Sequence, residues 1–596
     1  MNQMTKTQLQ RFNWMPLPCW TVCLALCLIA GCKGQTVTSP ASDVKVKPTD
    51  EGDMLSQAFG FIERLAEFES KTVNKQINYF LSRWLSENKN IPLDWKMDEF
   101  VAKVPEQAAE LVSPKELKRK YVSRSDVRYV KECIWMRIVA KWAIEHTPKA
   151  GLIKLQTKLT GAEANQLREA KRLFQWTMRN VQLKGFPRAP KTILAGTRKV
   201  EWPSRRSVAG PGYEFFPWQV VMQGVGDTWQ RARVFMLLLR QRGIDSVMLG
   251  VDETEADSAE PKFRYWAPAV MIGQQLYLFD TKLGIPLPGK VEGSIATLEE
   301  VNAHPEILSD LDVGSLFTYP TRKSELSKVV ALLNISPDSL GRRWYFMESR
   351  LAGKHKTVLT QSPTRLRNRL QKCKGVKSVH FWRVPFETIF YRRKVQLALE
   401  NPNSGFSKAY YQSYGVFERF GPLVQARLMH LSGIFDKTEE RKMGAKSIYM
   451  TLRVSDFEVQ RLHMDRNVQE QHGVIRQKKH TNEQWRSIVM STKLQMIVQK
   501  MHASYWIGLI HFESGKLDAA SQWFSGRLLE KYKKTKQGDP CIWRAGAIFN
   551  LGRTYEAMGK IKEARRTYLE DETLGRHGSL VRARMLRKFL KPEKAP

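Results

Sequence analysis

The stretch GVGDTWQRARVFMLLLRQRGI, residues 224–244, has the pattern of a tight turn followed by one amphipathic helix. Gly224 and Gly226 suit the turn because glycine adopts backbone angles that other residues avoid. Apolar residues then recur at helical spacing, and Gly243 stands where a helix commonly ends. The stretch therefore predicts a helix over residues 228–241 that begins directly after a glycine turn.

The segments around this stretch predict a mixed helix and strand unit. Residues 161–185 show helical spacing of apolar residues, and a loop rich in Pro and Gly follows. Residues 246–252 and 265–280 alternate as β-strands do, with Gly273 at a hairpin turn. One helix followed by several strands indicates the α+β class for this part of the chain.

These segments together resemble the start of a transglutaminase-like (papain-type) core. In that family a Leu-Leu-Arg-x-x-Gly-Ile signature follows the catalytic turn, and residues 238–244 read LLRQRGI. The preceding helix in the family often carries an aromatic residue, a Trp and an Asn-Val pair. The matching residues here are Phe174, Trp176, Asn180 and Val181. The resemblance covers the segment from about 160 to 300 and implies a transglutaminase-like domain there.

The catalytic positions of that family are altered in this chain. The mechanism uses a Cys nucleophile, a His base and an Asp that orients the His. The resemblance places Thr228 at the Cys position and Tyr265 at the His position, so only Asp280 agrees. No His falls between residues 147 and 303, and no Cys falls between 134 and 372. A degenerate, non-catalytic domain is therefore favoured, in which Asp280 accepts hydrogen bonds from Tyr265 or from a backbone N–H.

Two carboxylates in the segment have a second interpretation. Asp227 and Asp280 could perform acid–base chemistry if they lay close together. Asp227 directly precedes the predicted helix, where Asp is a favoured N-cap, and we favour the capping role. The chain has no HExxH motif and no GxxxxGK[ST] or GxGxxG phosphate loop. Neither a metal nor a cofactor is expected.

The N-terminus resembles the signal of a bacterial lipoprotein. An apolar run over residues 16–31, too short to span a bilayer comfortably, ends in Leu-Ile-Ala-Gly before Cys32. The resemblance implies that residues 1–31 are a signal peptide and that Cys32 is lipidated, which anchors the chain in the cell envelope on the periplasmic or exterior side. An ordinary secretory signal and an N-terminal anchor are the alternatives. Residues 32–50 are small and polar, as in a flexible tether.

Two C-terminal segments repeat with an offset of 44 residues. They are YWIGLIHFESGKLDAASQWF, residues 505–524, and FNLGRTYEAMGKIKEARRTY, residues 549–568. The matched small residues are Gly508 and Gly552, Gly515 and Gly559, and Ala520 and Ala564. The pattern resembles tetratricopeptide repeats, which are paired helices that bind proteins or peptides. A generic pair of helical hairpins is the alternative.

These patterns predict a multi-domain, predominantly α protein with an α+β transglutaminase-like domain and a C-terminal helical-repeat segment. The expected parts after the tether are a helical domain at 51–160, the transglutaminase-like domain at 161–300, a mixed, mainly helical region at 301–495, and repeats with a basic tail at 496–596. Within the mixed region, residues 322–335 look helical and residues 378–386 look like a strand.

Charge favours anionic partners. The formal net charge is +37, from 96 Lys and Arg against 59 Asp and Glu. An anionic surface or polymer would suit this balance, and a generally basic, solvated surface is the alternative. An export signal and the absence of a recognised module argue against nucleic acid. The three cysteines that follow Cys32, which are Cys133, Cys373 and Cys541, are too scattered for a disulfide framework. The favoured function is a membrane-tethered binding or scaffold protein. The alternative is a transglutaminase-like peptidase or acyl transferase with a non-standard nucleophile.

Overall fold

The protein is predominantly helical, as the sequence predicts. The computed structural model describes residues 53–590, apart from residues 69, 89–93, 147–153, 187–191, 196–197, 202–211, 259, 402–403, 405, 408–409, 412–414, 419–420 and 438–442. The predicted signal peptide, the tether and Cys32 therefore lie outside the described residues. Helices account for 58% of the structure, with a small mixed sheet, which confirms the predominantly α class.

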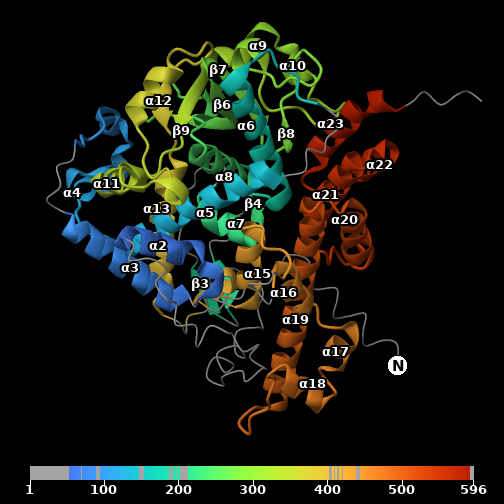
Figure 1. Cartoon of the computed structure of the whole chain (residues 1–596). Coiled ribbons are helices and arrows are strands. Elements are labelled where there is room, and N and C mark those ends of the chain that lie inside the picture. Colours follow the sequence, from blue (N-terminus) through green and yellow to red (C-terminus); the bar gives the residue numbers. More distant parts are fainter. Residues whose placement is uncertain are drawn as a thin grey trace, which may run out of the picture.

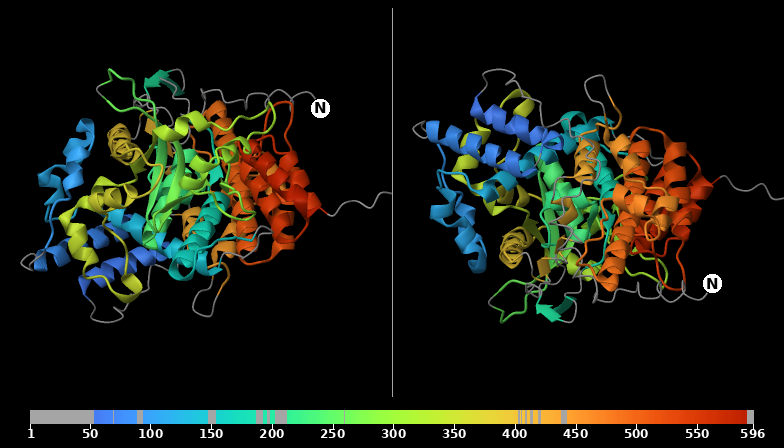
Figure 2. Two further views of the ribbon diagram at one scale, coloured as in Figure 1. Left: turned by 90° about the horizontal axis from the view of Figure 1, so that it is seen from above. Right: turned by 90° about the horizontal axis from the view of Figure 1, so that it is seen from below.

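A six-stranded sheet lies between the N-terminal and C-terminal helices (Figure 2). Its strands, in spatial order, are β10 (Val379–Phe381), β9 (Val329–Leu333), β5 (Ser246–Asp252), β6 (Phe263–Ile272), β7 (Gln275–Asp280) and β8 (Ile285–Pro286). β10 is parallel to β9, and the other neighbours are antiparallel. The predicted hairpin is confirmed, since β6 and β7 pair across Gly273, whose φ is 60°. Two strands lie beyond residue 300, so the sheet extends into the region predicted as mainly helical.

Helices cover both faces of this sheet. On one face α6 (Gly161–Asn180) and α8 (Thr228–Gln241) pack against it, and the ring of Phe279 lies 5.1 Å from Phe174 and 5.2 Å from Phe235. Because successive strand residues point to opposite faces, the neighbouring Leu278 joins a second core on the other side. That side is covered by α9 (Leu298–Ala303), α10 (Glu306–Ser309) and α12 (Pro363–Leu370).

The N-terminal helices pack against α8 through the long buried helix α5. They are α2 (Met54–Glu63), α3 (Ser70–Glu87), α4 (Pro114–Leu117) and α5 (Arg124–His146). The fully buried Asp126 of α5 forms ion pairs with Arg119 at 2.7 Å and with Arg343 at 2.6 Å. Arg343 belongs to α11 (Arg342–Glu348), so this charge cluster joins the N-terminal helices to the middle of the chain.

One prediction for the mixed region is wrong, and a second is confirmed only at its start. Residues 322–335 form a 3-10 turn at Lys323–Lys328 and then strand β9 in place of a helix. Residues 378–386 begin with β10 but continue as α13 from Val384. The apolar run of β9 is buried at every position, so its sequence lacks the alternation that marks a half-buried strand.

The other elements of this part complete the core. Near the start of α8 lie α7 (Pro217–Gln223) and the short parallel pair β1 (Gln182–Leu183) and β4 (Val225–Gly226). Between β1 and α7 in the sequence, β2 (Thr192–Ala195) and β3 (Arg198–Glu201) form an antiparallel hairpin. Further along come α13 (Val384–Leu399), α15 (Pro422–Leu431), α16 (Ala445–Thr451), α17 (Asp456–Arg461) and α18 (Arg466–Gln471).

The C-terminal helices stack beside the sheet unit (Figure 1). They are α19 (Asn482–Glu513), α20 (Leu517–Phe524), α21 (Arg544–Ala557), α22 (Ile561–Leu569) and α23 (Arg576–Leu586). α19 is one continuous helix, with α17 and α18 beside its N-terminal half (Figure 1). Between α20 and α21 the chain forms a π-helical turn at Ser525–Glu530, in the stretch that lengthens the repeat beyond 34 residues.

Candidate functional site

The turn before α8 is held by a capping box. Asp227 Oδ1 accepts hydrogen bonds from the backbone N–H of Trp229 at 3.0 Å and of Gln230 at 2.9 Å. The side chain of Gln230 accepts in return from Asp227 N at 3.0 Å. Asp227 Oδ2 accepts from Gly212 N at 3.1 Å, and burial raises the pKa of this carboxyl group. The capping interpretation of Asp227 is confirmed, because both its oxygens are used by backbone donors.

Tyr265 contacts Trp229, the residue that follows Thr228, and among the described residues no ring contact or hydrogen bond joins it to Thr228 itself. Thr228 is the first residue of α8 and is 6% exposed, and its backbone oxygen accepts from Thr281 Oγ1 at 2.9 Å. The ring of Tyr265 on β6 meets Trp229 edge-on at 5.6 Å and Trp382 at 5.5 Å. Burial raises the pKa of Tyr265 far above its ordinary value. A phenol held protonated among indole rings is unsuited to act as the base for a hydroxyl nucleophile.

Asp280, at the end of β7, belongs to a different cluster. Its Oδ1 accepts from the backbone N–H groups of Lys282 at 2.8 Å and Leu283 at 2.7 Å. Its Oδ2 accepts from the hydroxyl of Tyr319 at 2.9 Å, and that hydroxyl accepts from Trp266 Nε1 at 2.9 Å. The expected backbone donors are confirmed. The expected donor Tyr265 is wrong, because Tyr319, which is outside the resembling segment, occupies that position.

The three triad positions are therefore not brought together as a catalytic group. Tyr265 packs with Trp382 in the core on the α8 side of the sheet. Asp280 is bonded to Tyr319, which belongs to the core on the other side. In a triad the acid must contact the base in order to orient it, whereas the hydrogen bonds of Asp280 serve the turn after β7.

The two repeat units have matching geometry at their matched residues. Gly515 and Gly559 end the first helices with φ of 72° and 73°. A Cβ atom on Gly508 would lie 2.7 Å from the ring of Phe524, and one on Gly552 would overlap the ring of Tyr568. Ala520 and Ala564 are fully buried. In each unit the glycine of the first helix thus leaves room for the aromatic ring of the second helix to pack closely against it.

The first helices of the repeats face the rest of the protein. Tyr505 of α19 and Asn550 of α21 both donate to the backbone oxygen of Arg179 at the end of α6, at 3.1 and 3.2 Å. Gln182 accepts from Gly546 N at 2.7 Å and donates to Ile542 O at 2.9 Å. α6, β1 and the repeats consequently share one hydrogen-bonded interface, which the sequence patterns do not indicate.

Among the described residues, neither a cluster of metal ligands nor a reactive thiol is found. No group of three or more His, Cys, Asp or Glu side chains there could hold a metal ion. Cys133, Cys373 and Cys541 are all buried, and burial raises the pKa values of Cys133 and Cys541 to about 11. Such thiols stay protonated at neutral pH and are poor nucleophiles. Over the same residues, no helix is long and apolar enough to cross a membrane.

Comparison with known proteins adds no relative. No protein-family model, no curated protein and no solved structure matches this chain. The resemblances to transglutaminase-like proteins, bacterial lipoproteins and tetratricopeptide repeats therefore remain predictions that rest on the sequence motifs.

Proposed function

We propose that this chain is a non-catalytic binding or scaffold protein of the cell envelope, tethered to a membrane by a lipid on Cys32. In this proposal the segment 161–300 is a rigid module inherited from a transglutaminase-like enzyme. The C-terminal helices provide the surface for a protein or peptide partner. The charge of +37 favours an acidic partner.

The surroundings of Tyr265 are the observation that carries the proposal. At the position where the resembling family has its base, this ring is packed between Trp229 and Trp382. Tyr265 therefore offers no imidazole to take the proton of a Thr228 hydroxyl, and an alcohol without a base is a weak nucleophile. The alternative, an acyl transferase or peptidase using Thr228, requires a base that none of these contacts provides.

One side of the repeat helices packs against the rest of the protein, which leaves only the opposite side for a partner. α19 and α21 are hydrogen-bonded to α6 and β1, so that side of the repeats is already covered. The second helices, α20 and α22, pack on their neighbours in the stack and carry exposed Lys562 and Arg566 on α22. We propose that an acidic protein partner docks on this outer side.

Amine incorporation and peptide hydrolysis test the non-catalytic assignment. The purified chain and the Thr228→Ala variant should both be inactive, since neither contains a nucleophile with a base. Activity in the parent chain that disappears in the variant would establish the enzyme alternative.

The tether is tested separately. Cys32→Ser should abolish fatty-acid labelling and release the chain from the membrane fraction, because stable anchoring needs the acyl chains. Unchanged labelling and membrane retention in the variant would reject lipidation at this residue.

A further inference from the structure

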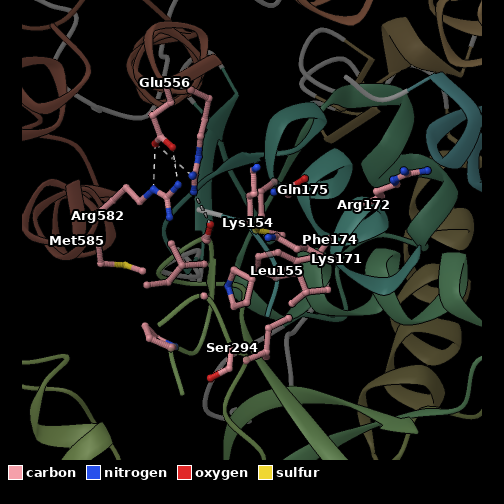
Figure 3. Close-up of a pocket in the computed structure, with 18 of the residues that line it drawn as sticks. Lys154, Leu155, Lys171, Arg172, Phe174, Gln175, Ser294, Glu556, Arg582 and Met585 are labelled. Carbon is pink, nitrogen blue, oxygen red and sulfur yellow. Dashed lines mark hydrogen bonds and ion pairs between the residues drawn. The ribbon is translucent and has the colours of Figure 1, made fainter. Parts of the chain in front are cut away.

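A pocket of about 590 Å³ lies where α6 meets the C-terminal helices. Its walls are residues of α6, the loop after β8, α21 and α23. Figure 3 shows Lys171 and Gln175 of α6 facing Arg582 and Met585 of α23 across the space. Pockets of this size commonly hold small molecules, and their position between two units of a protein is a usual one.

The lining is strongly basic. Four lysines and five arginines line the pocket, against two glutamates, Glu292 and Glu556. Both carboxylates already have cationic partners. Glu556 pairs with Arg582 and with Arg553, and Glu292 pairs with Lys588 at 2.7 Å. Among the described residues no further carboxylate lines the space, so the pocket has a large excess of positive charge.

The buried side chain of Arg179 is the observation that indicates a ligand in this pocket. Its side chain lines the pocket but is only 5% exposed, and its guanidinium carbon lies 5.0 Å from the centre of the Phe512 ring. Its Nε and Nη2 atoms are buried without a hydrogen-bond partner among the residues that the structure describes. A buried donor that lacks an acceptor costs free energy, and a charged one costs more. A bound anion would supply the acceptors.

The positive charges around the pocket repel one another, and this repulsion helps to lower the pKa values of two basic side chains. Burial, together with the nearby charges of Arg582 and Arg553, lowers the pKa of Lys171 to about 8. Burial and the charge of Arg553 likewise lower the pKa of Arg179 to about 10, although Glu513 opposes the shift. These cations therefore converge on a common space, and an anion placed there would relieve their repulsion.

Apolar side chains complete the lining. Phe174 of α6, Phe512 of α19 and Phe549 of α21 contribute rings, and Met178 and Met585 contribute thioethers. A hydrated inorganic ion would leave this surface unused. The lining therefore fits a ligand whose charged end is joined to an apolar or aromatic body.

We propose that this pocket binds a small phosphate monoester, with the phosphate on Lys171, Arg179 and Arg553 and an apolar body against the phenylalanine rings. A dianionic phosphate matches the excess charge better than a single carboxylate does, and arginine binds phosphate oxygens with two parallel N–H donors. The phosphate could be that of a soluble molecule or of a lipid headgroup. The site is independent of the triad positions and of the partner surface in the proposed function.

Calorimetric titration of the full chain with phenyl phosphate tests the site. Phenyl phosphate should bind, and benzoate, which has the same ring with one negative charge, should bind at least about tenfold more weakly. Arg179→Met and Lys171→Met should each weaken phenyl phosphate binding by about tenfold or more, as expected for loss of a charge-assisted hydrogen bond. Arg466→Gln is the matched control, because it removes an exposed charge of α18, outside the pocket.

Each outcome decides for or against the pocket. Circular dichroism checks folding, and Lys171→Met alone carries the test if Arg179→Met does not fold, since Lys171 is only partly buried. Absence of binding to the parent chain, equal binding of benzoate, or unchanged affinity in the pocket variants would overturn the proposal.

Sedimentation with vesicles containing phosphatidic acid identifies the source of the phosphate. Vesicle binding that Lys171→Met abolishes supports the site with a lipid phosphate, and binding of phenyl phosphate alone supports it with a soluble one.

Discussion

His430 Nε2 and Glu513 Oε2 lie 3.1 Å apart in the interior, where they join α15 to the end of α19. Arg427 Nη1 lies 3.2 Å from His430 Nδ1. Since Arg only donates, Nδ1 is the acceptor and the imidazole proton is on Nε2, directed at Glu513. Asn180 of α6 donates to the other carboxylate oxygen at 2.9 Å. Three separate parts of the chain thus meet at one buried carboxylate.

The charge of Glu513 is maintained by these neighbours. Burial alone would raise the pKa of Glu513, but hydrogen bonds from His430 and Asn180, with the charges around them, bring it below its ordinary value. Burial lowers the pKa of His430, so its ring is neutral. The carboxylate therefore accepts from neutral donors on both sides.

Glu513→Gln should reduce the free energy of unfolding by about 2–3 kcal/mol, because the amide NH2 then faces a donor from either His430 or Asn180. Urea unfolding at neutral pH measures the loss. Glu570→Gln is the control, since Glu570 is exposed at the end of α22. Equal stability of the two variants would show that the network does not hold α6, α15 and α19 together.

Acid should weaken the C-terminal helices through Glu556. Burial opposes its charge, yet Arg582, Arg553 and the Tyr568 hydroxyl lower its pKa to about 2. A carboxylate with a folded pKa below the unfolded value stabilises the protein above about pH 4.5 and loses that stabilisation as the pH falls towards 2. The shift corresponds to about 3 kcal/mol. The free energy of unfolding, measured at a series of pH values, should fall more steeply between pH 4.5 and about 2 in the parent chain than in the Glu556→Gln variant. Parallel curves would contradict this role.

Ala564→Glu should destabilise the repeats by several kcal/mol, on the scale of a buried unpaired charge. Ala564 is fully buried within α22, which packs between α21 and α23. Thermal unfolding followed by circular dichroism measures the effect. Gln522→Glu places the same carboxylate on an exposed position of α20 and should be nearly neutral. A normal melting temperature for Ala564→Glu would reject the close packing of the repeat helices.

Local patterns predicted single elements well. The helix at 228–241 and the strand at 246–252 have the predicted bounds, because a glycine turn and clear periodicity mark them. β9 was mistaken for helix because it is buried at all five positions and shows no alternation. The basic pocket could not be predicted, since α6, α21 and α23 are brought together only by tertiary packing. Tyr319 was missed for the same reason, as it reaches Asp280 across 39 residues.

The double variant Thr228→Cys/Tyr265→His should remain inactive in amine incorporation and peptide hydrolysis, although it restores two residues of the family's triad. The introduced imidazole would replace a ring packed between Trp229 and Trp382. Asp280 would not orient it, because its oxygens are taken by two backbone N–H groups and by the hydroxyl of Tyr319. An unoriented base contributes little to activating a thiol. Thiol reactivity towards a chromogenic disulfide serves as the control that the new cysteine is present and accessible. Appearance of acyl-transfer activity would show that Asp280 can leave Tyr319, and that the module keeps a working catalytic shape.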